Sequence, residues 1–172
     1  HVRFWDFAST EVQTNQRGTQ TNDPDWTVGT RVTEVDGQFW VIDMRRDRLT
    51  PKGVEDLVVQ TATLDGKGVE IWLEQEPGSS GVKVIDDYQR RALQGYTVHS
   101  LRSTGSKTER ARPASSAAEA KNIFLVEGPW IGTFLDEVCL FGQPGVHDDI
   151  ADTLSGAHSV LTTGTKRAGT WR

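Results

Sequence analysis

The chain has 172 residues, of which 35% are hydrophobic and 25% are charged, so it suits one compact domain with a substantial core. The formal net charge of −5 counts against a generally basic nucleic-acid-binding domain, and no apolar run is long enough to span a membrane. The single cysteine, Cys139, excludes an internal disulfide framework and a cysteine-based zinc site, which favours a reducing, cytoplasmic setting.

Three strands are expected first along the chain. The apolar and aromatic run at 2–9 predicts a buried strand, and a long polar loop follows over about 10–22. The runs 26–35 and 38–46 flank Asp36-Gly37, a strong short signal for a hairpin. We therefore expect the sheet to begin with three strands in an antiparallel meander.

Strands and helices then alternate. Thr50-Pro51 supplies an N-cap and a first helical residue, so a helix is expected from there to the glycine-rich segment LDGKG. This order predicts a mixed α/β sheet of five or more strands with helices on both faces. We place the domain at 1–162 and a C-terminal tail at 163–172. The remaining elements are expected as strands at 69–74, 96–101 and 122–127 and as helices at roughly 81–94, near 114–120, from Pro129, and from Val146 or His147 to about Leu161.

Two acids stand in strands, where acids are unexpected. Asp6 interrupts the apolar segment RFWDFA, and a buried carboxylate is costly unless it is paired, hydrogen-bonded or bound to a metal. Glu74 closes VEIWLE, and strand alternation places it on the same face as Glu70 and Trp72. Because ligands of open sheets gather at strand ends, Asp6 and Glu74 are candidate site residues.

A third group of acids lies at the start of the last helix, in the segment HDDIAD. At about 100° per residue, Asp149 lies at the border of the apolar stripe of this helix, and Asp148 and Asp152 lie on its far side. The helix dipole favours one or two acids at this position, but it explains neither Asp152 nor the acids in the strands. The helix phase therefore favours Asp149 as the acid that points toward Asp6 and Glu74.

Carboxylates from two strands and a late helix are thus expected to converge. Clustered carboxylates repel one another unless a cation lies among them, and their oxygen atoms suit Mg²⁺ or Mn²⁺. Two such ions about 4 Å apart can activate a water and stabilise the leaving oxygen when a phosphodiester is cleaved. The pattern therefore predicts a two-metal site for phosphodiester chemistry.

These motifs, in their order along the chain, resemble the C-terminal nuclease domain of the large terminase subunit of tailed bacteriophages. The resemblance covers roughly residues 3–157. It implies an RNase H-like fold, in agreement with the expected order of strands and helices. The segments that carry it are FWDFAST, DPDWTVG, FWVIDMRRDRLTP, IWLEQEPGSSG, GYTVHSLRSTGSKTERARP, NIFLVEGPW, FLDEVCLF and GVHDDIAD.

The resemblance also implies an activity and a setting. The activity is a metal-dependent, largely sequence-nonspecific endonuclease that cleaves double-stranded DNA during viral genome packaging, with two Mg²⁺ or Mn²⁺ ions. The family carries a packaging ATPase ahead of the nuclease, whereas this chain has none, so we expect the isolated nuclease domain of a longer motor protein. That motor would work with the portal and the small terminase subunit in the cytoplasm of a bacterial host, with no membrane partner.

The resemblance further assigns roles to particular residues. Asp6 would contact both metals, Glu74 would be the second acid, and the last ligand would come from the Asp148-Asp149 pair. The resemblance leaves the choice within that pair open, and the helix phase favours Asp149. Two more acids, Asp152 and Asp25, would be outer neighbours of the metals, and Lys107 and Arg110 would contact DNA phosphates.

Two other functions remain open at this stage. The same fold can serve a junction resolvase or a transposase-like strand-transfer enzyme, which would prefer branched DNA. A module that docks on a packaging partner without catalysis would tolerate loss of the acids. Basic clusters such as Arg45, Arg46 and Arg48 are expected to be solvated surface groups.

Overall fold

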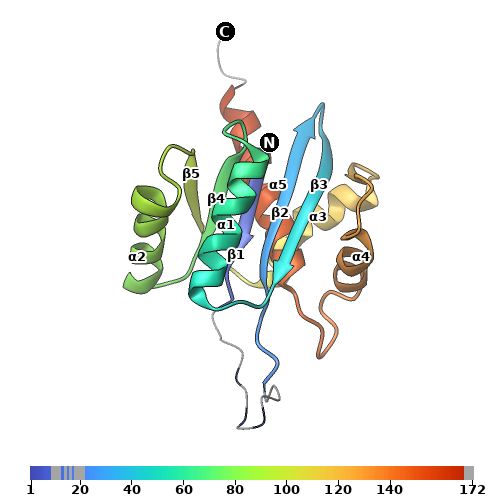
Figure 1. Ribbon diagram of the computed structural model, residues 1–172. Helices are drawn as coiled ribbons and strands as arrows, with labels where there is room; N and C mark the ends of the chain where they lie inside the picture. Colours follow the sequence, from blue (N-terminus) through green and yellow to red (C-terminus); the bar gives the residue numbers. More distant parts are fainter. Residues whose placement is uncertain (9–12, 14, 16, 18–21, 169–172) are drawn as a thin grey trace.

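The sheet of the protein has six strands in the order β5-β4-β1-β2-β3-β6, as seen in a computed structural model that describes residues 1–8, 13, 15, 17 and 22–168 (Figure 1). Most of the long polar loop expected at about 10–22 therefore lies outside the described residues. Side chains are described as far as residue 164.

The strands form a mixed sheet whose first three members are an antiparallel meander, as predicted. β4 runs parallel to β1, β5 runs parallel to β4, and β6 runs parallel to β3. Asp36 and Gly37 both have positive φ, at 52° and 79°, which the predicted tight hairpin between β2 and β3 requires. The strands are β1 (Val2–Asp6), β2 (Thr27–Val35), β3 (Gln38–Asp47), β4 (Glu70–Gln75), β5 (Val98–Arg102) and β6 (Ile123–Leu125).

Helices cover both faces of the sheet, which confirms the predicted α/β architecture (Figure 1). Among the described residues, no helix is both long and apolar enough to cross a membrane. The helices are α1 (Pro51–Asp65), α2 (Ser79–Asp87) with the π-helical turn η1 (Tyr88–Ala92), α3 (Lys107–Glu119), α4 (Ile131–Cys139) and α5 (Asp149–Ala168).

Two helix boundaries differ by about seven residues from those predicted. α3 begins at Lys107 rather than near 114, because Ser106 and Glu109 form a reciprocal capping box and Pro113 is accommodated inside the helix. α5 ends at Ala168 rather than near Leu161, so much of the expected tail is helical. The domain boundary at 162 stays a prediction.

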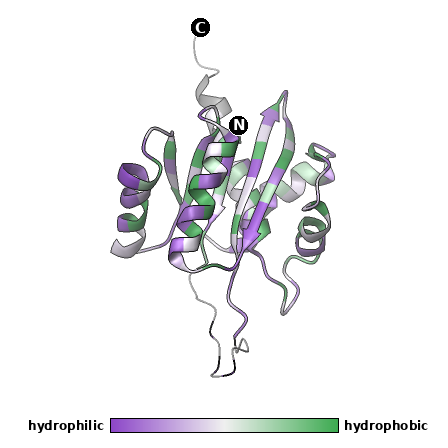
Figure 2. Cartoon of the chain, in the orientation of Figure 1, coloured by the Kyte–Doolittle hydropathy of each residue, from purple (hydrophilic) through white to green (hydrophobic). Residues whose placement is uncertain are grey.

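The two faces of the sheet bury separate hydrophobic layers, and the strands alternate between hydrophilic and hydrophobic residues (Figure 2). Phe4 packs in the layer that contains α5, and Trp5 packs in the layer that contains α1. Gly156 of α5 lies directly against the ring of Phe4, where an added Cβ would be 2.6 Å from Cε2. Because Gly156 has no side chain, α5 can lie close to β1.

A charged network lies between β1 and the end of α1. The guanidinium of Arg3 is almost fully buried, and it donates to Asp65 at 2.5 Å and to Asp43 at 2.8 Å. It also donates to the Gly29 carbonyl at 2.9 Å. A buried guanidinium requires these partners, because an unpaired buried charge is strongly unfavourable.

Candidate active site

The predicted site residues meet at the end of the sheet where β1 finishes and α5 begins (Figure 1). Asp6 is the last residue of β1, and Glu74 lies near the end of β4, the parallel neighbour of β1. In the register of these strands Trp5 pairs with Leu73, so Asp6 and Glu74 follow as the next residues of both strands on the face that carries α5. Parallel pairing therefore brings together two carboxylates that lie far apart in the sequence.

The carboxyl of Asp6 lies in an environment that disfavours its charge. Burial raises its pKa well above the ordinary value, and the nearby charges of Glu74, Asp152 and Asp149 raise it further. Burial also raises the pKa of Glu74, while a hydrogen bond from the Ser103 hydroxyl opposes this rise. The charges of three other acids thus act on Asp6, as expected for a cluster that a cation would stabilise.

Asp149 opens α5 and is buried. Burial raises its pKa to about 6, although the backbone N–H of Trp26 donates a hydrogen bond to its Oδ2 at 3.2 Å and opposes this rise. Asp149 is therefore a buried acid held by a backbone contact from the segment that precedes β2. Its charge also acts on Asp6, in agreement with the direction expected from the helix phase.

Asp152 was expected on the far side of α5, and this expectation was wrong. Its side chain is buried, because it lies one helical turn before Gly156, which contacts Phe4 of the sheet, and because α3 also packs against α5. Its carboxylate accepts from Arg110 at 2.6 Å and pairs with Lys107 at 3.2 Å, and its charge acts on both Asp6 and Glu74. Asp152 is thus a full member of the acid cluster.

Asp148 lies just before α5 and is half-buried. Its Oδ1 accepts from Lys107 at 2.5 Å. Its charge is not among the largest that act on Asp6, whereas those of Asp149 and Asp152 are. The structure therefore brings Asp149 and Asp152 together with the acids of the strands and directs Asp148 toward α3.

Lys107 and Arg110 lie in the first turns of α3 and face the acids. Arg110 bridges Asp152 and Glu74, whose carboxylate oxygen is 3.8 Å from the guanidinium. Burial lowers the pKa of Lys107, but hydrogen bonds and attraction from Asp148 and Asp152 outweigh it, so the pKa is raised overall. These cations partly neutralise the cluster, and their predicted contact with DNA phosphates stays a prediction.

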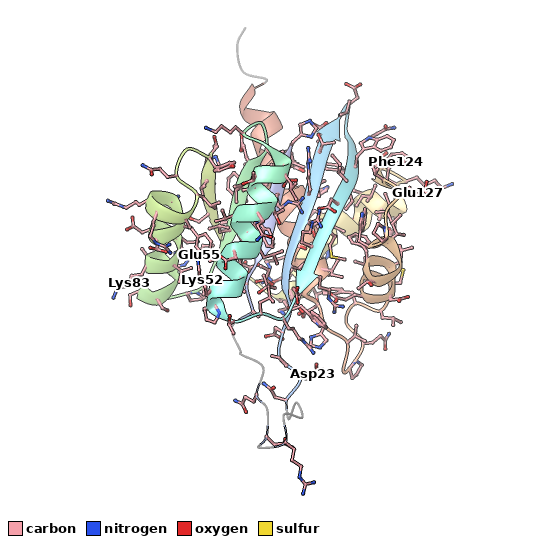
Figure 3. The ribbon with its side chains drawn as sticks, in the orientation of Figure 1. Asp23, Lys52, Glu55, Lys83, Phe124 and Glu127 are labelled. Atoms are coloured by element: carbon pink, nitrogen blue, oxygen red, sulfur yellow. The ribbon has the colours of Figure 1, made fainter. Side chains whose placement is uncertain are left out.

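A second group of possible ligands lies beside Asp149. Among the described residues, Asp25, His147 and Asp149 each offer one ligand atom, and these atoms all lie within 4.8 Å of one another. Asp25 was expected as an outer neighbour of the metals, but His147 was not predicted as a ligand. Asp23, which lies close to this group near the start of β2 (Figure 3), accepts from His147 at 3.0 Å.

In the basic cluster at the end of β3, Arg45 is exposed as expected, but Arg46 and Arg48 are not solvated surface groups. Arg46 and Arg48 each lie 4.0 Å from the centre of the Trp26 ring, and both are partly buried. Arg46 also donates to Glu137 of α4 at 2.9 Å. The burial of Glu137 could have been predicted from its spacing along α4. It lies three residues after the buried Phe134, on the buried side of that helix.

The acid cluster opens into a cavity of about 330 Å³ between α5, α3 and β5. Glu74, Asp152 and Arg110 line it, and the apolar side chains of Phe4 and Leu101 contribute to its wall. Two of the four acids, Glu74 and Asp152, therefore border this cavity.

Comparison with known proteins assigns the chain to a family. The family model described as the terminase RNaseH-like domain matches residues 3–161, almost the entire chain. The chain belongs to the terminase RNase H-like domain family. A search of the curated proteins finds no significant match.

Solved structures agree with the fold of this terminase family. The terminase nuclease domain of human cytomegalovirus, solved after soaking with Mn and with an inhibitor bound, is 12% identical with a TM-score of 0.64, over 92% of this chain and 81% of that one. The large terminase nuclease of the thermophilic phage G20c is 16% identical with a TM-score of 0.55, over 91% and 82% of the two chains.

A fowlpox virus resolvase, solved with Holliday junction DNA, is also similar. It is 14% identical with a TM-score of 0.52, over 94% of this chain and 97% of that one. At these identities the likeness supports the fold alone. The RNase H-like fold expected from the sequence is thereby confirmed for this terminase domain.

Proposed function

We propose that this domain is a metal-dependent endonuclease that hydrolyses phosphodiester bonds of double-stranded DNA with two divalent ions, largely without sequence preference. The observation that carries the proposal is the convergence of Asp6, Glu74, Asp149 and Asp152 from two parallel strands and one helix. Buried and half-buried acids gathered at one point weaken the fold, and a function that needs a cation explains them.

The residues at this point fit a hard divalent cation. They offer carboxylate oxygens, the ligands that Mg²⁺ and Mn²⁺ prefer, and burial together with mutual repulsion raises the pKa of Asp6 and Glu74. Asp6, Glu74 and Asp149 would hold the ions, and Asp152 ranks ahead of Asp148 as the further ligand because its charge acts on Asp6. When bound, the ions would activate a water for attack and stabilise the leaving oxygen.

The other residues of the site would act on the DNA and on the acids. Lys107 and Arg110 would move from the carboxylates toward the phosphates of the substrate once cations replace them in the cluster. The cavity beside Glu74 and Asp152 gives the DNA strand a place to approach. His147 and Asp25 would complete the surroundings of Asp149 on its other side.

Membership of the terminase family supports a role in viral genome packaging. In that role the domain would follow a packaging ATPase in the same polypeptide and would work with the portal and the small terminase subunit. The setting would be the cytoplasm of a bacterial host. The partners and the location are part of the proposal.

A plasmid-nicking assay tests the activity. The domain is incubated with supercoiled DNA and Mn²⁺ or Mg²⁺, and relaxed and linear products are expected. Either ion should also raise the melting temperature, because it binds the folded acid cluster and not the unfolded chain. Intact plasmid with every divalent ion tested, or equal cutting by Asp6→Asn and Glu74→Gln, would contradict the proposal.

Resolution of branched DNA is a second candidate, since the fold is shared with the fowlpox virus resolvase. The same assay with matched linear duplexes and four-way junctions separates the two functions. Faster cleavage of junctions would favour the resolvase, and equal rates per phosphodiester would favour the packaging nuclease. A non-catalytic docking module would cut neither substrate.

A further inference from the structure

We infer that Glu137 and Arg46 are positioning residues for Asp149, which they hold in place by fixing the first turn of α5 and the backbone of Trp26. This inference rests on the proposed function, because the importance of Asp149 depends on its role as a metal ligand. The charges of Glu137 and Arg46 are not among the largest that act on Asp6, although the charge of Glu137 also acts on Asp149.

Glu137 gives α5 a cap that comes from another helix. The backbone N–H groups of a first helical turn have no partner inside the helix, and a side chain must satisfy those that are buried. Oε1 of Glu137 accepts from the N–H of Ile150 at 2.6 Å, although the two residues belong to α4 and α5. A carboxylate also suits the positive end of the helix dipole. Glu137 therefore fixes the backbone directly beside Asp149.

Arg46 connects this cap to the other contact of Asp149. Oε2 of Glu137 accepts from Arg46 at 2.9 Å, and the guanidinium of Arg46 lies over the ring of Trp26 at 4.0 Å. The backbone N–H of Trp26 donates to Asp149 at 3.2 Å. The contacts thus form a closed circuit that holds Asp149 from its own helix and from the chain before β2.

The position of Glu137 favours this role over a purely structural one. Its side chain is 5% exposed and lies beside Phe134 on the buried side of α4, where an apolar residue would pack without the cost of burying a charge. A buried ion pair gives little net stability, but it fixes one geometry. The geometry fixed here is that of the first turn of α5.

The test compares variants that remove different parts of the circuit. Glu137→Gln keeps an oxygen for the Ile150 N–H but loses the ion pair with Arg46, whereas Glu137→Ala loses both. Arg46→Met keeps apolar contact with Trp26 and loses the charge. Asp136→Ala is the matched control, because Asp136 is the exposed acid next to Glu137 on the same helix.

The Mn²⁺ dissociation constant of each variant is measured without DNA, well below the melting temperature of that variant. The Mn²⁺ concentration that gives half the maximal rate of plasmid cleavage is measured separately. We expect the Mn²⁺ dissociation constant to rise about 10-fold for Glu137→Ala, as for other residues that orient metal ligands, with a smaller rise for Glu137→Gln and Arg46→Met. Saturating Mn²⁺ should restore much of the cleavage rate. Asp136→Ala should match the wild type.

Amide hydrogen exchange provides a readout that does not depend on activity. Loss of Glu137 should accelerate exchange at the backbone amides of Ile150 and Trp26. If Glu137 were merely structural, its loss would change the melting temperature, but exchange would not accelerate specifically at these two amides. Unchanged exchange at Trp26 in folded Glu137→Ala, or Mn²⁺ binding equal to that of the wild type, overturns the inference. A wild type that binds no Mn²⁺ and cuts no DNA instead overturns the proposed function, and exchange at Trp26 still decides the positioning role.

Discussion

Nη2 of Arg110 lies 2.6 Å from Oδ1 of Asp152, so a cation of α3 occupies the acid cluster from within the protein. Lys107 does the same from the preceding turn, 3.2 Å from Oδ2 of Asp152. The metal-free cluster is therefore partly neutralised by its own side chains. Any divalent ion that binds there must displace or rearrange these contacts.

Arg110→Ala should destabilise the metal-free domain and increase the stabilisation by metal. Removal of the guanidinium leaves the buried Asp152 with fewer partners, at a cost of about 1–3 kcal/mol. Thermal unfolding with and without Mn²⁺ measures both effects. Arg90→Ala is the control, since Arg90 forms an exposed pair with Asp86 on a helical surface, and it should change neither value appreciably. A smaller shift with Mn²⁺ in Arg110→Ala than in the wild type would contradict this competition.

Asp6→Asn should abolish activity and yet stabilise the metal-free protein. The pKa of Asp6 is raised by burial and by three neighbouring acids, so a neutral amide relieves repulsion. We expect cleavage to fall at least about 100-fold. The melting temperature without metal should rise by about 2–4 °C for each kcal/mol of repulsion removed. Unfolding scans and nicking rates give both numbers, and a melting temperature that falls would mean that the carboxylate is not under repulsion.

The stability of the metal-free domain should depend on Asp149 between about pH 4 and pH 6. The pKa of Asp149 is raised to about 6 in the folded state, from an unfolded value of 3.8. In this window the folded state binds more protons than the unfolded state, so ionisation of Asp149 lowers stability as the pH rises, by up to about 3 kcal/mol. Other acids titrate in the same window, so the informative quantity is the difference between the wild type and Asp149→Asn. Parallel stability curves for these two proteins would refute the shift.

Asp65→Asn should be among the most destabilising charge-removing substitutions outside the acid cluster. Arg3 is 1% exposed and depends on Asp65 for two hydrogen bonds, so removal of that charge leaves the buried guanidinium with Asp43 as its remaining acidic partner. Loss of one partner of a buried ion pair costs about 3–5 kcal/mol. Asp56→Asn on the same helix is the matched control, because Asp56 pairs with Lys52 in an exposed i,i+4 contact. Denaturant unfolding distinguishes the two, and similar midpoints would contradict the prediction.

Local signals in the sequence were sufficient for much of the fold. Asp36-Gly37 determines its own turn through positive φ, and Thr50 caps α1 through its own side chain, which accepts from Gly53. The two acids of the strands could be predicted because an acid within an apolar strand is costly wherever the strand lies. Each of these features depends on residues that are near one another in the chain.

Features that depend on distant packing could not be predicted in the same way. The helix phase predicts Asp152 on the far side of α5, whereas the packing of α5 against β1 and α3 buries its side chain. Glu137 caps a helix other than its own, and Arg46 and Arg48 stack on a tryptophan about twenty residues away in sequence. By contrast, the start of α3 could have been predicted from neighbouring residues, since Ser106 and Glu109 form a capping box.

The contact between Gly156 and Phe4 sets a limit on how the acids can be spaced. Gly156 lies one helical turn after Asp152 and two turns after Asp149, and α5 is continuous over this length. A methyl group at Gly156 would push the helix away from β1, and both acids would move with it relative to Asp6. The absence of a side chain at Gly156 therefore limits how far the carboxylates of α5 lie from Asp6, and it would also limit the size of the ion that they share in the proposed function.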